Sequence, residues 1–236
     1  MRKQILTVLL IPIFLFGDML SPLAQSGELK EEADLFLAAC HQVEMHHPLE
    51  NLKGKTPDYT IPFFGTFGAG KGPTRKEQHH PATDLKVEGG ETDVDLFAAH
   101  DGVVSTIRDA PKYRHFISIT KIIRDDDGKE LGKVVTLYGH VDLDLDEEDG
   151  LELDGKTVKA GELISKHLWN GTRGGPHLHF EIRYYRPDDD GTEEFYSFRE
   201  SVPGAGKWPY GFWSAEHGFG FGEPESHGLK LADDAQ

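Results

Sequence analysis

The sequence predicts a mainly β protein, organised as a compact antiparallel sheet or sandwich that a short helix precedes. Its 236 residues suit one domain with appendages. The 27 glycines and 14 phenylalanines, together with short valine-rich runs, favour β structure. From residue 82 onward, short apolar runs alternate with turn residues, which is typical of an antiparallel sheet.

Residues 1–26 are expected to be a secretory signal peptide. Arg2 and Lys3 form its positive start, and small residues at 24–26 suit a cleavage site. The apolar run 5–16 is too short to span a hydrocarbon layer of about 30 Å. A membrane anchor is the alternative. The prediction is therefore export to the periplasm or the bacterial cell surface.

Residues 27–61 are expected to form an N-terminal helix and a linker. An amphipathic pattern over 28–45 predicts the helix, with Cys40 on its buried side. Residues 37–40 also spell a lipoprotein box, but charged residues stand where such a box needs an apolar run. The stretch 48–78 is rich in Gly, Pro and Lys, so we expect a linker into the first strand.

The core domain is expected over 62–186. Turn residues at 125–128 connect two strong apolar runs, which predicts an antiparallel hairpin. A second turn signal lies at 154–156. The predicted strands are 103–107, 116–123, 134–138, 157–164 and 177–185.

Two further stretches have unusual composition. Residues 141–154 hold eight Asp or Glu, and we expect a solvated acidic loop. A calcium site is the alternative, although the EF-hand spacing is absent. Residues 187–236 form an aromatic- and Gly-rich C-terminal extension. Its aromatic side chains are expected to pack across a sheet face, with stacking on sugar rings as the alternative.

The overall composition limits the partners. The formal net charge of −16 argues against nucleic acid and anionic membrane surfaces. A single cysteine excludes an internal disulfide and a Cys-rich zinc ribbon. No segment beyond the first 26 residues is apolar enough to span a membrane, so no stable insertion is expected after signal cleavage. No pattern predicts the oligomeric state.

Several of the 13 histidines stand where strands should begin or end. His177, His179 and Glu181 alternate with apolar residues, so they share one face of a strand. The Cα atoms of the two histidines then lie about 7 Å apart, twice the rise per residue. One imidazole can hold a metal while the other reaches a group bound beside it. A pair of surface histidines is the alternative.

A second candidate is His80-Pro81-Ala82-Thr83-Asp84. A straight strand would hold His80 and Asp84 about 13 Å apart, too far for one metal ion. Pro81 favours a bend here, and a curled entry into the strand brings both side chains to one ion. His79 is a competing ligand, one position away.

The third candidate is Tyr138-Gly139-His140, at the end of a predicted strand. His80, Asp84 and His179 together offer three nitrogen and oxygen ligands and leave the fourth position of a tetrahedral zinc open, as in catalytic sites. His140 and His177 then remain free to act on bound water and on developing charge.

The order of the three motifs resembles the lysostaphin-type zinc endopeptidases, which cut bacterial cell-wall peptides. The flanking segments 97–104, 158–164 and 170–181 are also similar to that family, and the resemblance covers 62–186. Segment 97–104 looks like the strand that leads out of the first motif. The family's fold implies a groove over one face of the sheet.

The same resemblance implies the site residues. His80, Asp84 and His179 would bind one zinc per chain, and His140 and His177 would be catalytic. One of these two histidines would accept the water proton and the other would stabilise the oxyanion, and the sequence leaves open which does which. Glu181 shares their face and suits a supporting role, or it is an ordinary surface carboxylate.

The implied function is an exported zinc metalloendopeptidase that hydrolyses peptide bonds in the stem or cross-bridge of peptidoglycan. The alternative from another class is a catalytically inactive scaffold of the same fold that binds and activates a cell-wall amidase. Such scaffolds lose metal ligands, whereas all five positions are present here. An aromatic sugar-binding module without chemistry is a third alternative.

Three features depart from the family pattern: His100 at a usually small or apolar place, the acidic stretch, and the long aromatic extension. The N-terminal segment raises a separate question. This segment offers candidate plugs for the open ligand position, since a thiolate is a strong zinc ligand and imidazoles also bind zinc. The candidates are Cys40, His41, His46 and His47. The competing interpretation is that Cys40 is a small buried residue on the helix.

Overall fold

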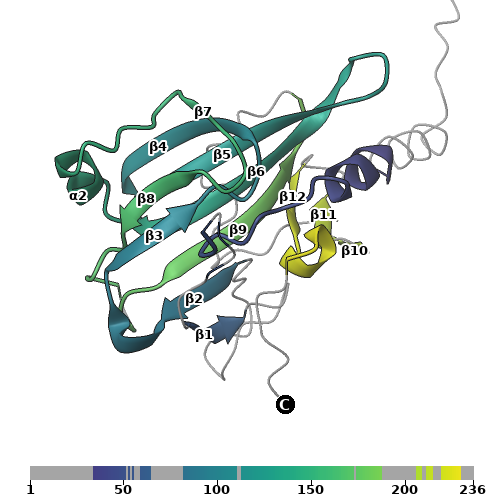
Figure 1. Ribbon diagram of the computed structural model, residues 1–236. Helices are drawn as coiled ribbons and strands as arrows, with labels where there is room; N and C mark the ends of the chain where they lie inside the picture. Colours follow the sequence, from purple (N-terminus) through teal and green to yellow (C-terminus); the bar gives the residue numbers. More distant parts are fainter. Residues whose placement is uncertain are drawn as a thin grey trace, which may run out of the picture.

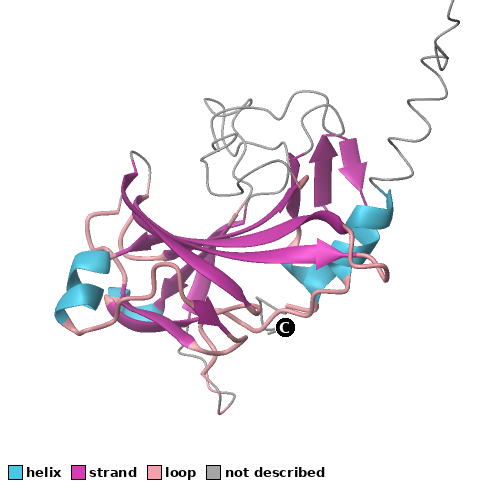
Figure 2. Cartoon of the chain, turned by 90° about the horizontal axis from the view of Figure 1, so that it is seen from above, coloured by secondary structure: helices cyan, strands magenta, loops and turns pink. Residues whose placement is uncertain are grey.

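A strongly curved antiparallel sheet forms the body of the protein in the computed structural model (Figures 1 and 2). Among the described residues, the strands form a ten-stranded sheet and a separate two-stranded sheet. Residues 34–41 are helical, so the prediction of a mainly β antiparallel fold with an N-terminal helix is confirmed. The structure describes residues 34–51, 53, 55, 59–64, 82–110, 113–172, 174–187, 206–208, 211–214 and 219–229.

The main sheet follows the order β10-β11-β12-β9-β6-β5-β4-β7, and β2 pairs with both β1 and β9. The predicted hairpin is confirmed, because β5 and β6 pair antiparallel around the turn at 125–128. The strands of this sheet are β1 (Tyr59–Phe64), β2 (Thr83–Val87), β4 (Gly102–Ala110), β5 (Arg114–Arg124), β6 (Glu130–Val141), β7 (Thr157–Val158), β9 (Leu178–Tyr185), β10 (Gly206–Trp208), β11 (Gly211–Ser214) and β12 (Phe219–Gly222).

The second sheet pairs β3 (Asp93–Phe97) with β8 (Leu163–His167). Apolar side chains of both sheets meet in one hydrophobic core, to which β9 contributes every second residue. The short helices are α2 (Leu143–Glu148) and two 3₁₀ turns, Glu88–Gly90 and Pro224–His227. None of the helices that the structure describes is long and apolar enough to cross a membrane.

The N-terminal helix and the 3₁₀ turn Pro224–His227 lie at the same end of the sheet (Figure 1). Phe36, Leu37 and Cys40 of the helix are buried in the main core. His227 donates a hydrogen bond from Nδ1 to the Val43 carbonyl, 3.0 Å away, and its Nε2 accepts one from the Tyr184 hydroxyl, 2.6 Å away. The interpretation of Cys40 as a zinc plug is therefore wrong, because its side chain is enclosed by apolar residues.

Two expected strands are each divided by a turn. Segment 97–104 is not continuous, since β3 ends at Phe97 and β4 begins at Gly102. The expected strand 157–164 is also split, because a turn closed by Lys159 and Glu162 passes the chain from β7 in the main sheet to β8 in the second. The chain crosses between the two sheets at both places, and this crossing interrupts each strand.

Two stretches expected to be irregular contain regular structure. Strand β1 lies within the stretch expected to be a linker, where it pairs with β2. The acidic stretch contains α2, so it is not a fully solvated loop. Asp146 is buried there because its carboxylate accepts hydrogen bonds from the Ser165 hydroxyl and the Lys166 amide, both at 2.7 Å.

The described part of the aromatic extension packs into the protein. Phe221 of β12 is buried and lies beside β9, with its ring 5.9 Å from the Arg183 guanidinium carbon. This supports packing rather than sugar stacking for Phe221. The side chains of the other aromatic residues in the extension lie outside the described residues.

We expect the N-terminal helix to contribute directly to stability. Leu37→Ala should lower the free energy of unfolding by about 2–5 kcal/mol, because it leaves a cavity in the core. Leu35 lies on the same helix but is 61% exposed, so Leu35→Ala is the matched control and should change this free energy by less than about 0.5 kcal/mol. Urea denaturation measures both. Equal, small effects would show that the helix does not belong to the cooperative unit.

The protein should lose stability in mild acid through its buried histidines. Burial lowers the pKa of His227 to about 4, although its bond to the Val43 carbonyl opposes this shift. The unfolded state therefore takes up the proton first as the pH falls from about 6.5 to about 4, and this one group removes up to about 3 kcal/mol of stability. His47 and His100, whose pKa values burial also lowers to about 4, act in the same direction.

Unfolding free energies at several pH values between 7 and 4 test the contribution of His227. The curve of His227→Gln should be flatter than that of the wild type over this window. Parallel curves would show that His227 does not control the acid sensitivity.

Candidate active site

Asp84, His179 and the end of β6 lie in a row across the main sheet. Asp84 of β2 is the direct cross-strand neighbour of His179 of β9. On its other side, His179 is paired with Gly139 of β6. Directly opposite residues on neighbouring strands have Cβ atoms about 4.5–5.5 Å apart. The pairing of β2 with β9 therefore places Asp84, the last residue of one motif, beside His179, the last residue of another.

A β-bulge turns His140 toward this row. His115 pairs with Val141 and Phe116 pairs with Gly139, so His140 is the extra residue on β6. Its φ angle of 63° is left-handed, which is uncommon for a residue with a side chain. Tyr138 and Val141 both point into the core, yet the ring of His140 lies 5.7 Å from that of His179. The bulge therefore aims His140 at the site rather than at the core.

Asp84, His177 and His179 meet at the N-terminal end of β9. Nδ1 of His179 lies 3.0 Å from Asp84 Oδ1, and Nε2 of His177 lies 3.7 Å from Asp84 Oδ2. The His177 ring is 4.8 Å from the His140 ring. The sequence predicted that His177 lies within the strand. In the structure it directly precedes the strand, but it still reaches the same site.

His179 is held on its far side by a buried ion pair. Its Nε2 lies 2.6 Å from Glu181 Oε1, and Arg183 Nε donates to Glu181 Oε2 at 2.5 Å. Burial alone would raise the pKa of Glu181, but Arg183 and His179 outweigh it and hold this pKa far below its usual range. For His179, burial acts in the other direction and lowers the pKa. Hydrogen bonds to Asp84 and Glu181 outweigh burial and raise the pKa of His179 to about 9.

The other two histidines each face a backbone carbonyl. Nδ1 of His140 faces the Tyr113 carbonyl at 3.3 Å, and Nδ1 of His177 faces the Gly175 carbonyl at 2.9 Å. A carbonyl only accepts, so each Nδ1 carries a proton. Burial, reinforced by His179 and His177, lowers the pKa of His140 to about 3, so its ring is neutral near pH 7.

The structure thus brings Asp84, His140, His177 and His179 together. His80, the remaining predicted ligand, and its competitor His79 lie outside the described residues. His100 lies elsewhere, fully buried, with its Nε2 3.2 Å from the Thr136 hydroxyl.

Sequence reasoning missed two contributors to the site, Tyr113 and Arg183. Tyr113 donates from its hydroxyl to Glu181 Oε1 at 2.8 Å and packs its ring 4.9 Å from that of His179. It stands just before β5, where no motif marks it. Arg183 continues the alternation of His179 and Glu181 on β9, and that period of two was the one signal that pointed to it.

A second group of possible ligands lies at the start of α2. His115, Asp142 and Asp144 offer atoms within 4.8 Å of one another. Asp144 is already paired with Arg108 and with Arg114, the latter at 2.9 Å. Nδ1 of His115 accepts from the Leu143 amide at 3.1 Å. Arg114 Nη2 also lies 3.6 Å from Asp142 Oδ1, so each member of the cluster has a partner within the protein.

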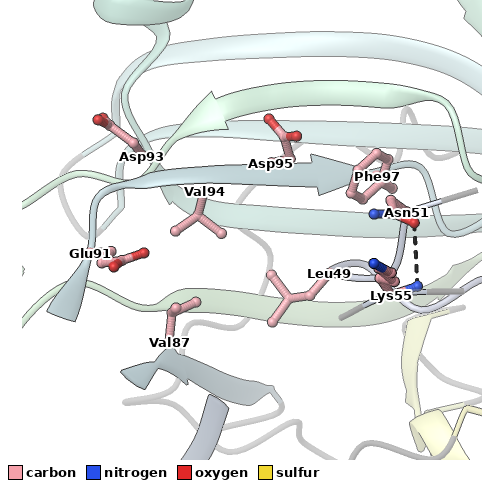
Figure 3. A pocket seen from close by; sticks show the side chains of 9 residues that line it. All are labelled: Leu49, Asn51, Lys55, Val87, Glu91, Asp93, Val94, Asp95 and Phe97. Carbon is pink, nitrogen blue, oxygen red and sulfur yellow. Dashed lines mark hydrogen bonds between the residues drawn. The ribbon is translucent and has the colours of Figure 1, made fainter. Parts of the chain in front are cut away.

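A pocket of about 250 Å³ opens beside the N-terminal segment (Figure 3). Leu49, Val87, Val94 and Phe97 form its apolar part, and exposed acidic residues form its rim. None of its lining residues belongs to the predicted site.

Comparison with known proteins identifies the fold family. The family model for peptidase family M23 matches residues 78–191, which include the whole row described above. Residues 78–191 form a domain of peptidase family M23. This is a family of metallopeptidases that typically hold zinc and act on peptidoglycan. No curated protein matches the chain.

Several solved structures are similar to the chain. Csd3 of Helicobacter pylori matches at 18% identity with a TM-score of 0.40, over 61% of this chain and 32% of that one. A zinc-containing peptidase from Vibrio cholerae matches at 23% identity and 0.42, over 60% and 36%. Lysostaphin matches at 15% identity and 0.37, over 64% and 60%. The chain spans about a third of the length of the first two proteins.

The described residues fit the metal of this family. Any two ligand atoms of a tetrahedral zinc lie about 3.4 Å apart. Asp84 Oδ1 and His179 Nδ1 are separated by 3.0 Å, close to that spacing. The opposite nitrogen of His179 faces a carboxylate, which is how proteins usually orient a metal-binding imidazole. The spacing of Asp84 and His179 therefore fits two ligands of one ion.

Proposed function

We propose that this M23 protein is an exported zinc metalloendopeptidase that hydrolyses peptide bonds in the stem or cross-bridge of peptidoglycan. The convergence of Asp84, His140, His177 and His179 carries the proposal. These four side chains lie together at the N-terminal end of β9 and are mostly buried. The spacing of two of them, Asp84 and His179, fits metal ligands.

In this proposal, His80, Asp84 and His179 hold the zinc. The bound ion supplies Lewis-acid chemistry and lowers the pKa of a coordinated water to about 7. His179 needs its Nδ1 free of a proton for this role, and Glu181 can keep the Nε2 proton in place. The proton transfers then fall to the two remaining histidines.

His140 and His177 handle the protons. Each directs its Nδ1 to a backbone carbonyl, which leaves Nε2 for the reaction. One ring, neutral, accepts the proton of the attacking water at its Nε2. The other, protonated at Nε2, donates a hydrogen bond to the negative charge that develops on the carbonyl oxygen. The His140 ring is neutral near pH 7, so a lone pair is available on it, but its lowered pKa also makes it a weak base.

The proposed location, the periplasm or the bacterial cell surface, follows from the proposed substrate and from residues 1–26, which we take as a signal peptide.

The alternative to an enzyme is a catalytically inactive scaffold that binds and activates a cell-wall amidase. Retention of Asp84, His140, His177 and His179 in one site argues against that alternative, since a scaffold needs none of their chemistry.

The mature protein should contain about one zinc per chain. Asp84→Ala and His179→Ala should each remove it, since each eliminates one of three protein ligands. Metal analysis of the purified variants measures this. Asp144→Asn is the matched control, because it changes a carboxylate of the other His/Asp cluster and should leave the zinc in place. Zinc loss in the control, but not in the two variants, would move the metal to that cluster.

His140→Ala and His177→Ala should keep zinc and fold but lose hydrolysis by roughly 10²–10⁴-fold, the scale of a positioned acid or base. The assay incubates each protein with purified peptidoglycan and identifies released fragments by mass spectrometry. His167→Ala, outside the site, controls for the loss of an imidazole. If the zinc-loaded wild type releases no fragments, the scaffold alternative replaces the enzyme.

A further inference from the structure

Tyr113 occupies the centre of the site without belonging to any motif. Its side chain is buried, and its ring lies 4.9 Å from the His179 ring and 5.7 Å from the His140 ring. A Cβ atom at Gly139 would stand 2.8 Å from Tyr113 Cδ1, closer than real contacts allow. Glycine in the Tyr-Gly-His motif therefore makes room for the Tyr113 ring.

The hydroxyl of Tyr113 acts on His179 through Glu181. It donates to Glu181 Oε1 at 2.8 Å, and this same oxygen lies 2.6 Å from His179 Nε2. Arg183 holds the other oxygen at 2.5 Å. The carboxylate is thus fixed from three directions inside the protein, where a mobile carboxylate would let the imidazole rotate.

The backbone of Tyr113 acts on the other side of the site. Its carbonyl faces Nδ1 of His140 at 3.3 Å, which fixes the tautomer of that ring. One residue therefore contacts the partner of a proposed metal ligand and a proposed proton acceptor.

A purely structural role for the ring is the competing explanation. Tyr113 also packs in a small apolar cluster with Ala110, Phe116 and Leu137. An apolar role needs the ring but not the hydroxyl. The hydroxyl is buried and directed at Glu181, so the two explanations differ in what its removal changes.

We propose that Tyr113 is a positioning residue, whose hydroxyl orients Glu181 so that His179 presents Nδ1 to the metal. The inference rests on the proposed function in one respect, that His179 is a zinc ligand. It extends that function by assigning a role to a residue outside the three motifs.

The test is the zinc dissociation constant of the mature protein, measured by competition with a chromophoric chelator. Tyr113→Phe keeps the ring and the backbone carbonyl and removes only the hydroxyl. It should weaken zinc binding by about 10–100-fold, the usual effect of losing a partner that orients a ligand. Tyr184→Phe is the matched control, because Tyr184 is equally buried but bonds to His227 on the opposite face of β9, and it should change the constant by less than about twofold.

A double-mutant cycle with Glu181→Gln separates positioning from packing. If Tyr113 acts through Glu181, Tyr113→Phe should weaken zinc binding much less in the Glu181→Gln background than in the wild type. Full additivity, or wild-type zinc affinity in Tyr113→Phe, overturns the inference. Urea denaturation confirms that each variant is folded before its affinity is compared.

The outcomes also separate this inference from the proposed function. A wild type that binds zinc tightly but releases no peptidoglycan fragments contradicts the enzyme and leaves the positioning role standing. A wild type that binds no zinc contradicts both. Tight, unchanged zinc binding in Tyr113→Phe, with an active wild type, contradicts the positioning role alone.

Discussion

The register of β9 between β2 and β6 is the constraint on which the site depends. Side chains alternate along this strand, with Leu178, Phe180 and Ile182 in the core and His179 on the opposite face. A slip of one residue would bury His179 in the core and expose Phe180 at the site, so the apolar face fixes the register. Once β9 is in place, its neighbours bring Asp84 from one side and the end of β6 from the other.

The buried charges along β9 are costly, and their arrangement makes sense as part of the site. Glu181 and Arg183 are both 1% exposed. A buried ion pair often contributes little net stability, because each charge loses several kcal/mol of hydration. Removal of one partner is far more damaging, since the other charge is left unpaired. The pair is therefore better explained by the fixed orientation that it gives His179 than by a gain in stability.

The sequence predicts the parts of this structure that follow from local pattern. The alternation of side chains around His179 was sufficient to predict β9, and the turn residues at 125–128 were sufficient to predict the β5–β6 hairpin. The bulge at His140 was not predictable, because it arises from the register with His115 and Phe116 on another strand. Likewise, no local pattern places Tyr113 under the site, since its partner Glu181 is distant in the chain. Motifs thus indicate which residues react, whereas long-range pairing decides how they are held.

The C-terminal extension takes part in the same network. Phe221 is the cross-strand neighbour of Arg183, and its ring covers the guanidinium at 5.9 Å. Arg183 therefore has an aromatic ring on one side and the Glu181 carboxylate on another, with little access to water. Exclusion of water strengthens the attraction between Arg183 and Glu181, because charges interact more strongly where the effective dielectric constant is low. The extension thus acts on the proposed metal centre through Arg183 and Glu181.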